Sequence, residues 1–269
     1  MQQIIPQIGL GTFRLQGQIV KDAVQQALQA GYRAIDTAQI YDNEAAIGEA
    51  IQASKISAQQ LFLTTKIWTE NLRTDRLIVS LKESLHKLKQ ERVNLTLIHW
   101  PAPQLGISVA EMMENLLAAK QAGLTEHIGV SNFNIDLTQQ AIDSIGLEHI
   151  TTNQIELSPY LQNQKLVDFL NQHQIQVSSY MTLAYGKVLN DPVLHTIAQR
   201  HQATTAQVSL AWALQLGHCV IPSSTKMLHL RENLAARQLK LSPEEMQLIS
   251  QLERNAREVN PEHLAPHWD

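Results

Sequence analysis

The chain has 269 residues, 44% of them hydrophobic, which is enough to bury one large core or two modest ones. Its net charge is −4 with both signs mixed along the chain, so we expect no nucleic-acid partner. The single cysteine, Cys219, excludes an intramolecular disulfide and a cysteine-rich metal site, and its apolar neighbours predict a buried side chain.

The N-terminal sequence predicts neither a leader nor a membrane anchor. Residues 1–6 carry no basic side chain and no long apolar run follows them. Nowhere does an apolar stretch approach the ~20 residues that a membrane span requires. We therefore expect a cytoplasmic protein with no membrane partner.

Short apolar runs alternate with longer amphipathic segments, which predicts βα units around a parallel sheet. In chain order, the apolar runs predict strands over 8–11, 33–36, 61–66, 95–99, 127–131, 152–156, 176–180 and 219–221. The amphipathic segments predict helices over 20–30, 44–54, 77–88, 109–122, 137–145, 165–172, 193–201, 206–216 and 228–236.

Local signals mark several helix ends. Gly31 is typical of a residue that stops a helix, and Thr204 with Gln207 predicts a capping box at the start of the 206–216 helix. Ser242, followed by proline and then Glu245, predicts one more helix, to about residue 252, outside the repeat. We expect the tail from there to residue 269 to be irregular.

Eight βα units on a chain of this length predict an α/β fold, a single (β/α)₈ barrel that occupies residues 1–269 as one domain. The rival is a doubly wound open sheet, which would show a glycine-rich fingerprint after its first strand. Gly9 and Gly11 match the first two glycines of that fingerprint, but no third glycine follows and no helix opens from the turn. The barrel is therefore favoured.

Three polar residues end apolar runs, and a fourth follows one of them in a loop. Asp36, Lys66 and His99 end the second, third and fourth runs, and Tyr41 lies in the loop after Asp36. Because the carboxyl ends of barrel strands meet on one rim, side chains there are typical of catalysis. Any one of these residues alone fits a structural role better, but a phenol, an amine, a carboxylate and an imidazole together make a proton donor.

Seven segments in order, from residue 9 to about 233, resemble the aldo-keto reductase family and, within it, the short bacterial diketogluconate and methylglyoxal reductases. They are GLGTFR (9–14), AIDTAQIYDNE (34–44), TKIW (65–68), LIHWP (97–101), IGVSNF (128–133), NQIE (153–156) and IPSS (221–224). The resemblance implies a monomeric barrel that binds NADPH in an extended pose and reduces aldehydes and ketones. Methylglyoxal and 2,5-diketo-D-gluconate represent the implied substrates, which are small 2-oxoaldehydes and keto-sugar acids.

The resemblance assigns Tyr41 as the proton donor, Lys66 and Asp36 as the pair that tunes it, and His99 as the group that orients the carbonyl. Elementary chemistry agrees, because the hydride must come from a cofactor and the proton from an acid near the developing alkoxide. A free phenol has a pKa near ~10, which a neighbouring Lys66 cation would lower. A neutral imidazole could donate from one nitrogen while a neighbour fixes the other.

The resemblance also implies contacts with the cofactor and the substrate, and no metal. The residues implied at the nicotinamide are Ser131, Asn132, Gln154 and Tyr180. Those implied along the ribose and pyrophosphate are Gly11, Thr12, Arg14 and Leu183. Those implied around the 2′-phosphate and adenine are Ser223, Ser224, Thr225, Lys226, His229 and Asn233. Phe13 and Trp68 would line the substrate opening, and Trp100 beside them fits either that role or packing at the rim.

Two segments depart from the family pattern. Residues 181–184 read Met-Thr-Leu-Ala, where many relatives have Ser-Pro-Leu-Gly. Ser223 and His229 stand where many relatives have a lysine and an arginine. Hydroxyl and backbone N–H groups before a helix N-terminus still suit an anion, and we expect Lys226 to carry much of the preference for NADPH over NADH.

Two other functions remain open. One is a regulatory barrel subunit that binds NADPH without catalysis, which the retained tetrad argues against. The other is an unrelated barrel isomerase or lyase, which would need a phosphate or metal site that we do not find in the sequence. The short loop at 101–107 and the compact tail predict an open pocket for small or polar carbonyl compounds.

Overall fold

The computed structural model describes residues 4–269, so residues 1–3 of the N-terminal segment considered above lie outside the described residues. Eight parallel strands follow one another around the sheet in sequence order. They are β1 (Leu10–Gly11), β2 (Ala34–Asp36), β3 (Phe62–Ile67), β4 (Val93–Ile98), β5 (Thr125–Ser131), β6 (Ile150–Glu156), β7 (Gln176–Tyr180) and β8 (Cys219–Val220).

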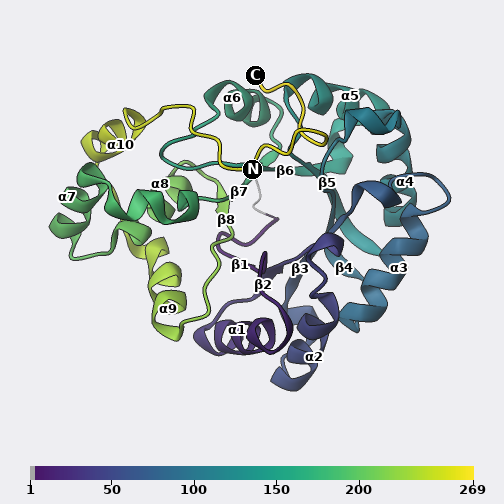
Figure 1. Ribbon diagram of the computed structural model, residues 1–269, viewed down its shortest axis with the longest axis horizontal. Helices are drawn as coiled ribbons and strands as arrows, with labels where there is room; N and C mark the ends of the chain where they lie inside the picture. The colour runs from purple at the N-terminus through teal and green to yellow at the C-terminus, as the bar shows by residue number, and fades with distance from the viewer. Residues whose placement is uncertain (1–3) are drawn as a thin grey trace.

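The first and last strands lie side by side, which closes the sheet. Ile8 forms a parallel bridge with Val220, and the Gly11 N–H donates to the Pro222 carbonyl at 3.1 Å. At this contact a Cβ on Gly11 would come within 2.5 Å of the Ile221 carbonyl oxygen, so the position requires glycine. The predicted barrel is confirmed, and the carboxyl ends of its strands meet on one rim (Figure 1).

Helices surround the sheet, and each predicted helix is present with its ends displaced by no more than a few residues (Figure 1). They are α1 (Gly17–Ala30), α2 (Glu44–Ser54), α3 (Leu77–Leu88), α4 (Val109–Gln121), α5 (Ile135–Ile145), α6 (Gln164–Gln172), α7 (Pro192–His201), α8 (Thr205–Gln215), α9 (Met227–Ala235) and α10 (Pro243–Ser250). None of these helices, within residues 4–269, has both the length and the apolar character needed to cross a membrane.

The predicted helix ends are also confirmed. Gly31 ends α1 in the left-handed conformation, with φ at 108°. Thr204 with Gln207 and Ser242 with Glu245 form capping boxes at the starts of α8 and α10. After α10 the described chain contains no further helix or strand, as the sequence predicts for the tail.

The core lies between the sheet and the helices, and α3 shows why these sequences pack there. Leu77, Leu81, Leu85 and Leu88 recur at spacings of three and four, and all four are buried. Burying one such side chain contributes roughly 1.5–3 kcal/mol. Cys219 in β8 is also fully buried, as predicted. The helices thus hold the strands rigidly, and the strands in turn position the side chains at the rim.

Candidate active site

A cleft of about 800 Å³ opens at the carboxyl ends of the strands, a size typical of small-molecule sites. Most of the residues singled out in the sequence line it. They are Gly11, Thr12, Phe13, Arg14, Asp36, Tyr41, Trp68, His99, Trp100, Ser131, Asn132, Gln154, Tyr180, Leu183 and Ser223. Lys66 lies beneath this lining, and Ser224, Thr225, Lys226, His229 and Asn233 lie outside it.

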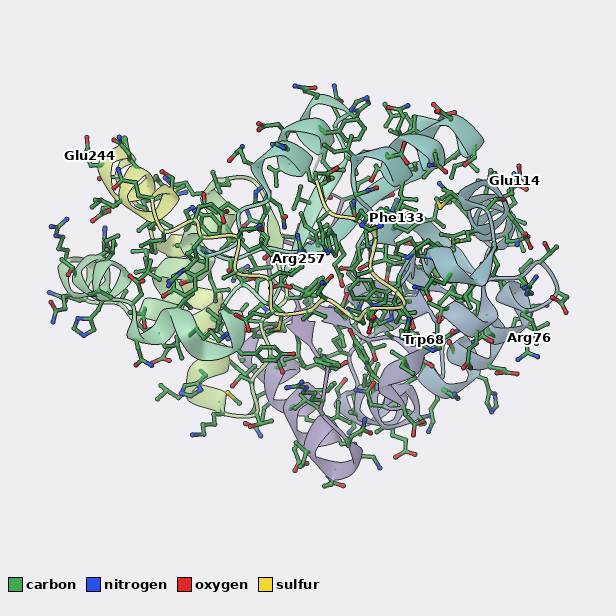
Figure 2. All side chains as sticks on the ribbon, turned by 45° about the horizontal axis from the view of Figure 1, so that its top comes forward. Trp68, Arg76, Glu114, Phe133, Glu244 and Arg257 are labelled. Atoms are coloured by element: carbon green, nitrogen blue, oxygen red, sulfur yellow. The ribbon has the colours of Figure 1, made fainter. Side chains whose placement is uncertain are left out.

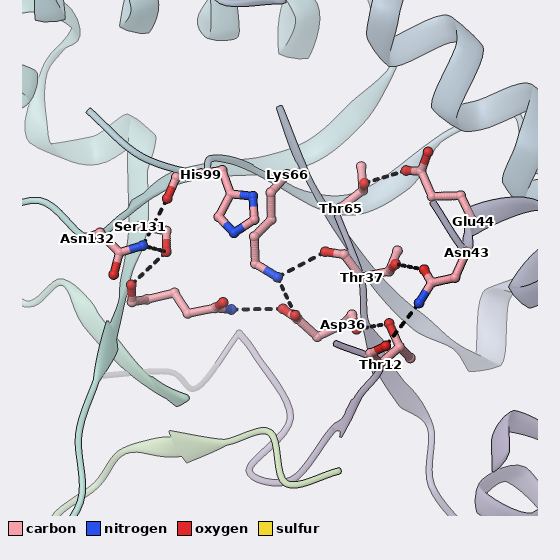
Figure 3. Close-up of polar contacts among 11 residues, drawn as sticks. Thr12, Asp36, Thr37, Asn43, Glu44, Thr65, Lys66, His99, Ser131 and Asn132 are labelled. Carbon is pink, nitrogen blue, oxygen red and sulfur yellow. Dashed lines mark hydrogen bonds and ion pairs between the residues drawn. The ribbon is translucent and has the colours of Figure 1, made fainter. Parts of the chain in front are cut away.

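Lys66 and Asp36 form a buried ion pair at the ends of neighbouring strands. The Lys66 ammonium donates to the Asp36 carboxylate and, at 2.9 Å, to the Thr37 carbonyl (Figure 3). The Gln154 amide donates to the other Asp36 oxygen at 2.8 Å. Burial alone would lower the pKa of Lys66, but Asp36 and Tyr41 outweigh it and hold that pKa above its ordinary value. Lys66 is therefore a cation at neutral pH.

Tyr41 ends a short 3₁₀ turn, η1 (Gln39–Tyr41), directly above this pair. The Lys66 ammonium nitrogen lies 5.1 Å from the centroid of the Tyr41 ring. Burial raises the pKa of Tyr41, and this effect exceeds the lowering by Lys66. Lys66 acts in the expected direction, but burial has the larger effect. The consequence is a phenol that stays protonated at neutral pH.

His99 follows β4, and its side chain contacts two aromatic rings. Its ring meets Tyr41 and Trp68 edge-on, with centroids 5.6 Å and 5.3 Å away. Burial, together with the Lys66 charge, holds the pKa of His99 well below its usual range, so the ring is neutral. Its enclosed Nδ1 finds no hydrogen-bond partner among residues 4–269, so the expected neighbour that fixes this nitrogen is absent from the described chain. Nε2 is the ring nitrogen left to face the cleft.

The four residues predicted at the nicotinamide form one hydrogen-bonded cluster. Asn132 donates to the His99 carbonyl at 3.0 Å and to the Ser131 hydroxyl at 3.1 Å (Figure 3). It accepts from the Tyr180 hydroxyl at 2.7 Å. The Ser131 hydroxyl donates to the Gln154 carbonyl at 2.8 Å. This cluster joins β5, β6 and β7 to the backbone of His99.

The segment that departs from the family pattern after β7 forms a second rim of the cleft. Met181, Ala184 and Tyr185 adopt left-handed backbone conformations, with φ between 44° and 55°. Tyr185, which the sequence analysis missed, lies beneath the Arg14 guanidinium, 4.8 Å from the carbon to the ring centroid. Phe13 faces the same guanidinium at 5.1 Å. The loops after β1 and β7 thus meet across the cleft through aromatic and cationic groups.

The turn between β8 and α9 carries the residues predicted around the 2′-phosphate. Ser224 accepts a hydrogen bond from the Lys226 backbone N–H at 3.1 Å, and Lys226 immediately precedes α9. The side chains of Lys226 and His229 are exposed, whereas Asn233 is buried within α9. The structure therefore places the predicted hydroxyls before a helix N-terminus and leaves the side chains of Lys226 and His229 in solvent.

The C-terminal tail forms a wall of the cleft that the sequence analysis missed. Residues from the tail line the same cavity as the tetrad; they are Glu258, Val259, Asn260, Pro261 and Leu264. In Figure 2 this yellow segment crosses from α10 past Arg257 toward Trp68. The tail is therefore part of the pocket that we expected to be open, rather than a segment beside it. Trp100 lines the cleft and also packs edge-on against Trp268, with ring centroids 6.5 Å apart.

Hydrogen bonds attach the tail near both of its ends. At its near end, the Glu156 carboxylate, at the end of β6, accepts from the backbone N–H groups of Glu258 and Val259 at 2.7 Å and 2.9 Å. At its far end, the Asp269 carboxylate accepts from the Ile135 N–H at the start of α5. Glu156 belongs to the NQIE segment, which was the one sequence signal that could have pointed to this wall.

Comparison with known proteins agrees with this geometry. The family model described as the Aldo/keto reductase family matches residues 7–254. The chain is 62% identical to methylglyoxal reductase DkgB of Yersinia pestis, over 98% of this chain and 99% of that protein. A crystal structure assigned provisionally as a 2,5-diketo-D-gluconic acid reductase B superposes with a TM-score of 0.95 at 43% identity, over 98% of this chain and 94% of the other.

A further crystal structure, that of a Gox0644 mutant in complex with NADPH, superposes with a TM-score of 0.88 at 36% identity. It covers 93% of this chain and 90% of the other. The family match spans nearly all of the barrel, and the Yersinia pestis relative matches from end to end. On this evidence of sequence and fold together, the chain belongs to the aldo/keto reductase family.

Proposed function

We propose that this protein reduces aldehydes and ketones to alcohols with NADPH, and that Tyr41 gives the proton. The substrates that we propose are small 2-oxoaldehydes such as methylglyoxal and keto-sugar acids such as 2,5-diketo-D-gluconate. The observation that carries the proposal is the gathering of Asp36, Tyr41 and His99 in one cleft, with the Lys66 cation beneath them. Two of the similar proteins carry the names methylglyoxal reductase and 2,5-diketo-D-gluconic acid reductase B, and these names support the same reaction.

The shape of the cleft fits an extended dinucleotide. One continuous cavity runs from the tetrad, past the cluster of Ser131, Asn132 and Gln154, to Ser223 at the end of β8. Amide and hydroxyl groups at one end suit a carboxamide, and hydroxyls before α9 suit a phosphate. NADPH bound there would supply the hydride. We propose that Lys226 contributes to the choice of NADPH over NADH from the exposed side of this turn.

The residues of the chain would handle the proton and the carbonyl. Because its pKa is raised, Tyr41 holds its proton at neutral pH and can pass it to the carbonyl oxygen as charge develops there. The phenolate that remains is stabilised by the adjacent Lys66 cation, which Asp36 holds in place. Neutral His99 can donate from Nε2 to the same oxygen and so aim the carbonyl at Tyr41.

The proposal is tested by mixing the protein with NADPH and a panel that contains methylglyoxal and 2,5-diketo-D-gluconate. We expect loss of the reduced-nicotinamide absorbance that depends on both protein and carbonyl. Binding of NADPH with no oxidation by any member of the panel would instead favour a regulatory subunit. No binding of NADPH at all would favour an unrelated barrel enzyme.

The proposal extends to the form in which the protein works. We propose that residues 1–269 act as one domain, as a monomer in the cytoplasm. The support for this is the family resemblance. Sedimentation at the concentration used for the kinetic assay would show whether a larger assembly is the active form.

A further inference from the structure

We infer that Gln39 is a positioning residue that holds the Tyr41 turn and the Trp68 loop in fixed relation, an inference that rests on the proposed reduction. Gln39 begins η1, two residues before Tyr41, and its side chain is half-buried. The Trp68 loop consists of Trp68 and the following turn η3 (Thr69–Asn71). Neither the proton donor role nor the cofactor site includes Gln39.

The Gln39 amide uses both of its ends. Its oxygen accepts from the Trp68 backbone N–H at 2.8 Å and from the Asn71 side-chain amide at 3.0 Å. Its nitrogen donates to the hydroxyls of Ser80 and Ser84 in α3, at 3.1 Å and 3.2 Å. These four bonds use both donor hydrogens and both acceptor positions of a carboxamide. One side chain therefore joins η1, the Trp68 loop and α3.

The direction of these bonds is fixed by the partners. The Trp68 N–H can only donate, so the atom facing it must be the amide oxygen. The Ser80 hydroxyl donates to the Leu77 carbonyl at 3.0 Å, so it accepts from Gln39. The site thus requires an acceptor on one side and donors on the other, which glutamine alone supplies at this length among neutral side chains.

We call Gln39 with its four hydrogen bonds the Gln39 clamp. It matters because the two segments that it joins, η1 and the Trp68 loop, carry the rings that contact His99. Tyr41 and Trp68 both meet the His99 ring edge-on. In the described chain, the hydrogen bonds that join η1 to the Trp68 loop all come from Gln39. A further side-chain bond to the Tyr41 turn, from Gln16 to the Tyr41 carbonyl, lies on the exposed surface. Without Gln39, the donor and the carbonyl-aiming ring lose their common anchor.

Space for such a shift is present behind the turn. A second cavity, of about 160 Å³, is lined by Gln39, Ile40, Trp68, Ser80, Ser84 and Lys87 among others. Ile40 and Trp68 line the large cleft as well, so they separate the two cavities. If the amide were lost, the turn could move into this space and take the Tyr41 phenol with it. A displacement of about 1 Å is enough to slow an oriented reaction by roughly 100-fold.

The test compares three variants: Gln39→Met, the conservative Gln39→Glu, and Gln215→Met as a matched control at another glutamine. Methionine keeps the length of the side chain and removes all four hydrogen bonds. Gln39→Glu keeps the acceptor for the Trp68 N–H and replaces the amide nitrogen, the donor to Ser80 and Ser84, with a second oxygen. The control is Gln215→Met in α8, because Gln215 also bridges a backbone through both ends of its amide, to Leu241 at 2.9 Å and 3.0 Å, away from the cleft.

Three quantities decide the outcome: kcat with methylglyoxal, the Kd for NADPH, and amide hydrogen exchange at Trp68. For Gln39→Met we expect kcat to fall about 10-fold or more while the Kd for NADPH stays within about twofold. We also expect the Trp68 amide to exchange faster, because its acceptor is gone. Gln215→Met should leave kcat unchanged, and Gln39→Glu should recover part of the loss.

The two ways of failing are distinguishable. An active wild-type protein whose Gln39→Met variant turned over as fast as Gln215→Met would remove the role of Gln39 and leave the proposed function standing. Unchanged Trp68 exchange in Gln39→Met would contradict the clamp itself. A wild-type protein that oxidised no NADPH with any carbonyl would overturn the proposed function, and the positioning role with it.

Discussion

Asp36 and His99 line the cleft at the ends of β2 and β4, with Lys66 of β3 beneath them, whereas Val259 and Pro261 reach it from a tail without regular structure. The first region, the floor, is held by a buried ion pair and by a barrel that fixes each strand end. The second, the tail wall, is held where backbone groups meet Glu156 and Asp269. The floor should therefore set the rate of the chemical step, and the tail wall should set how well a substrate is held.

The largest expected effect is on the floor. Tyr41→Phe removes the proton donor and keeps the ring that packs against His99. We expect kcat to fall by roughly 10²- to 10⁴-fold, with the Kd for NADPH nearly unchanged. Steady-state kinetics and a fluorescence titration of NADPH measure the two quantities. Equal losses in both would mean that Tyr41 shapes the site rather than performing the chemistry.

Loss of one buried charge from the floor should lower the unfolding free energy of the protein. Lys66→Met leaves the Asp36 carboxylate with the Gln154 amide but without its cation. Removing one partner of a buried pair typically costs about 3–5 kcal/mol of unfolding free energy, because the other charge stays buried. Urea denaturation should show this loss, and a second substitution, Asp36→Asn, should recover part of it. A double variant less stable than Lys66→Met would contradict the pairing.

Much of the floor is predictable from the sequence because a parallel strand is a local pattern with a fixed consequence. The apolar runs that end in Asp36, Lys66 and His99 predict both the strands and the common rim. The orientation of His99 was not predictable, since its ring is held by Tyr41 and Trp68 rather than by a hydrogen bond at Nδ1.

The tail wall could not be predicted for a different reason. Its position depends on contacts between residues far apart in the chain, such as Glu156 with the Val259 N–H and Asp269 with the Ile135 N–H. Tail residues themselves show no periodicity. The raised pKa of Tyr41 could not be predicted for a similar reason. Burial in the folded protein outweighs the Lys66 charge, which is the effect that the motif reveals.

The unfolding free energy should fall at acidic pH, partly because of a buried histidine outside both the floor and the tail wall. His218 lies at the amino end of β8, opposite the cleft, and burial lowers its pKa to about 4. As the pH falls below about 6.5, His218 gains a proton in the unfolded chain but stays neutral in the native protein. Unfolding free energy is therefore lost as the pH falls from about 6.5 toward the native pKa, by about 3 kcal/mol in total.

Urea denaturation across this pH range tests that expectation. His218→Asn should flatten the dependence of the unfolding free energy on pH relative to the wild-type protein. A slope in His218→Asn as steep as that of the wild-type protein would place the acid sensitivity elsewhere, with buried His99 on the floor as the next candidate.

The smallest effect is expected on the tail wall. In Glu156→Gln, one backbone N–H of the tail faces an amide nitrogen instead of a carboxylate oxygen, so one anchoring bond is lost. We expect the KM for methylglyoxal to rise about threefold to tenfold with kcat less affected. Arg92→Ala is the control, because the Arg92 pair with Glu126 is partly exposed, involves no residue of the tail and contributes little. A fall in kcat alone would contradict the division between floor and wall.

The pH dependence of kcat in the wild-type protein tests most sharply whether Tyr41 is the proton donor. Tyr41, whose pKa is raised by burial, stays protonated through neutral pH, and His99, whose pKa is held well below its usual range, stays neutral. The account therefore predicts a kcat that is level from about pH 6.5 upward through neutral pH and falls only at alkaline pH. A kcat that instead fell as the pH rose through about 6.5 would identify a histidine as the proton donor and contradict the assignment of Tyr41.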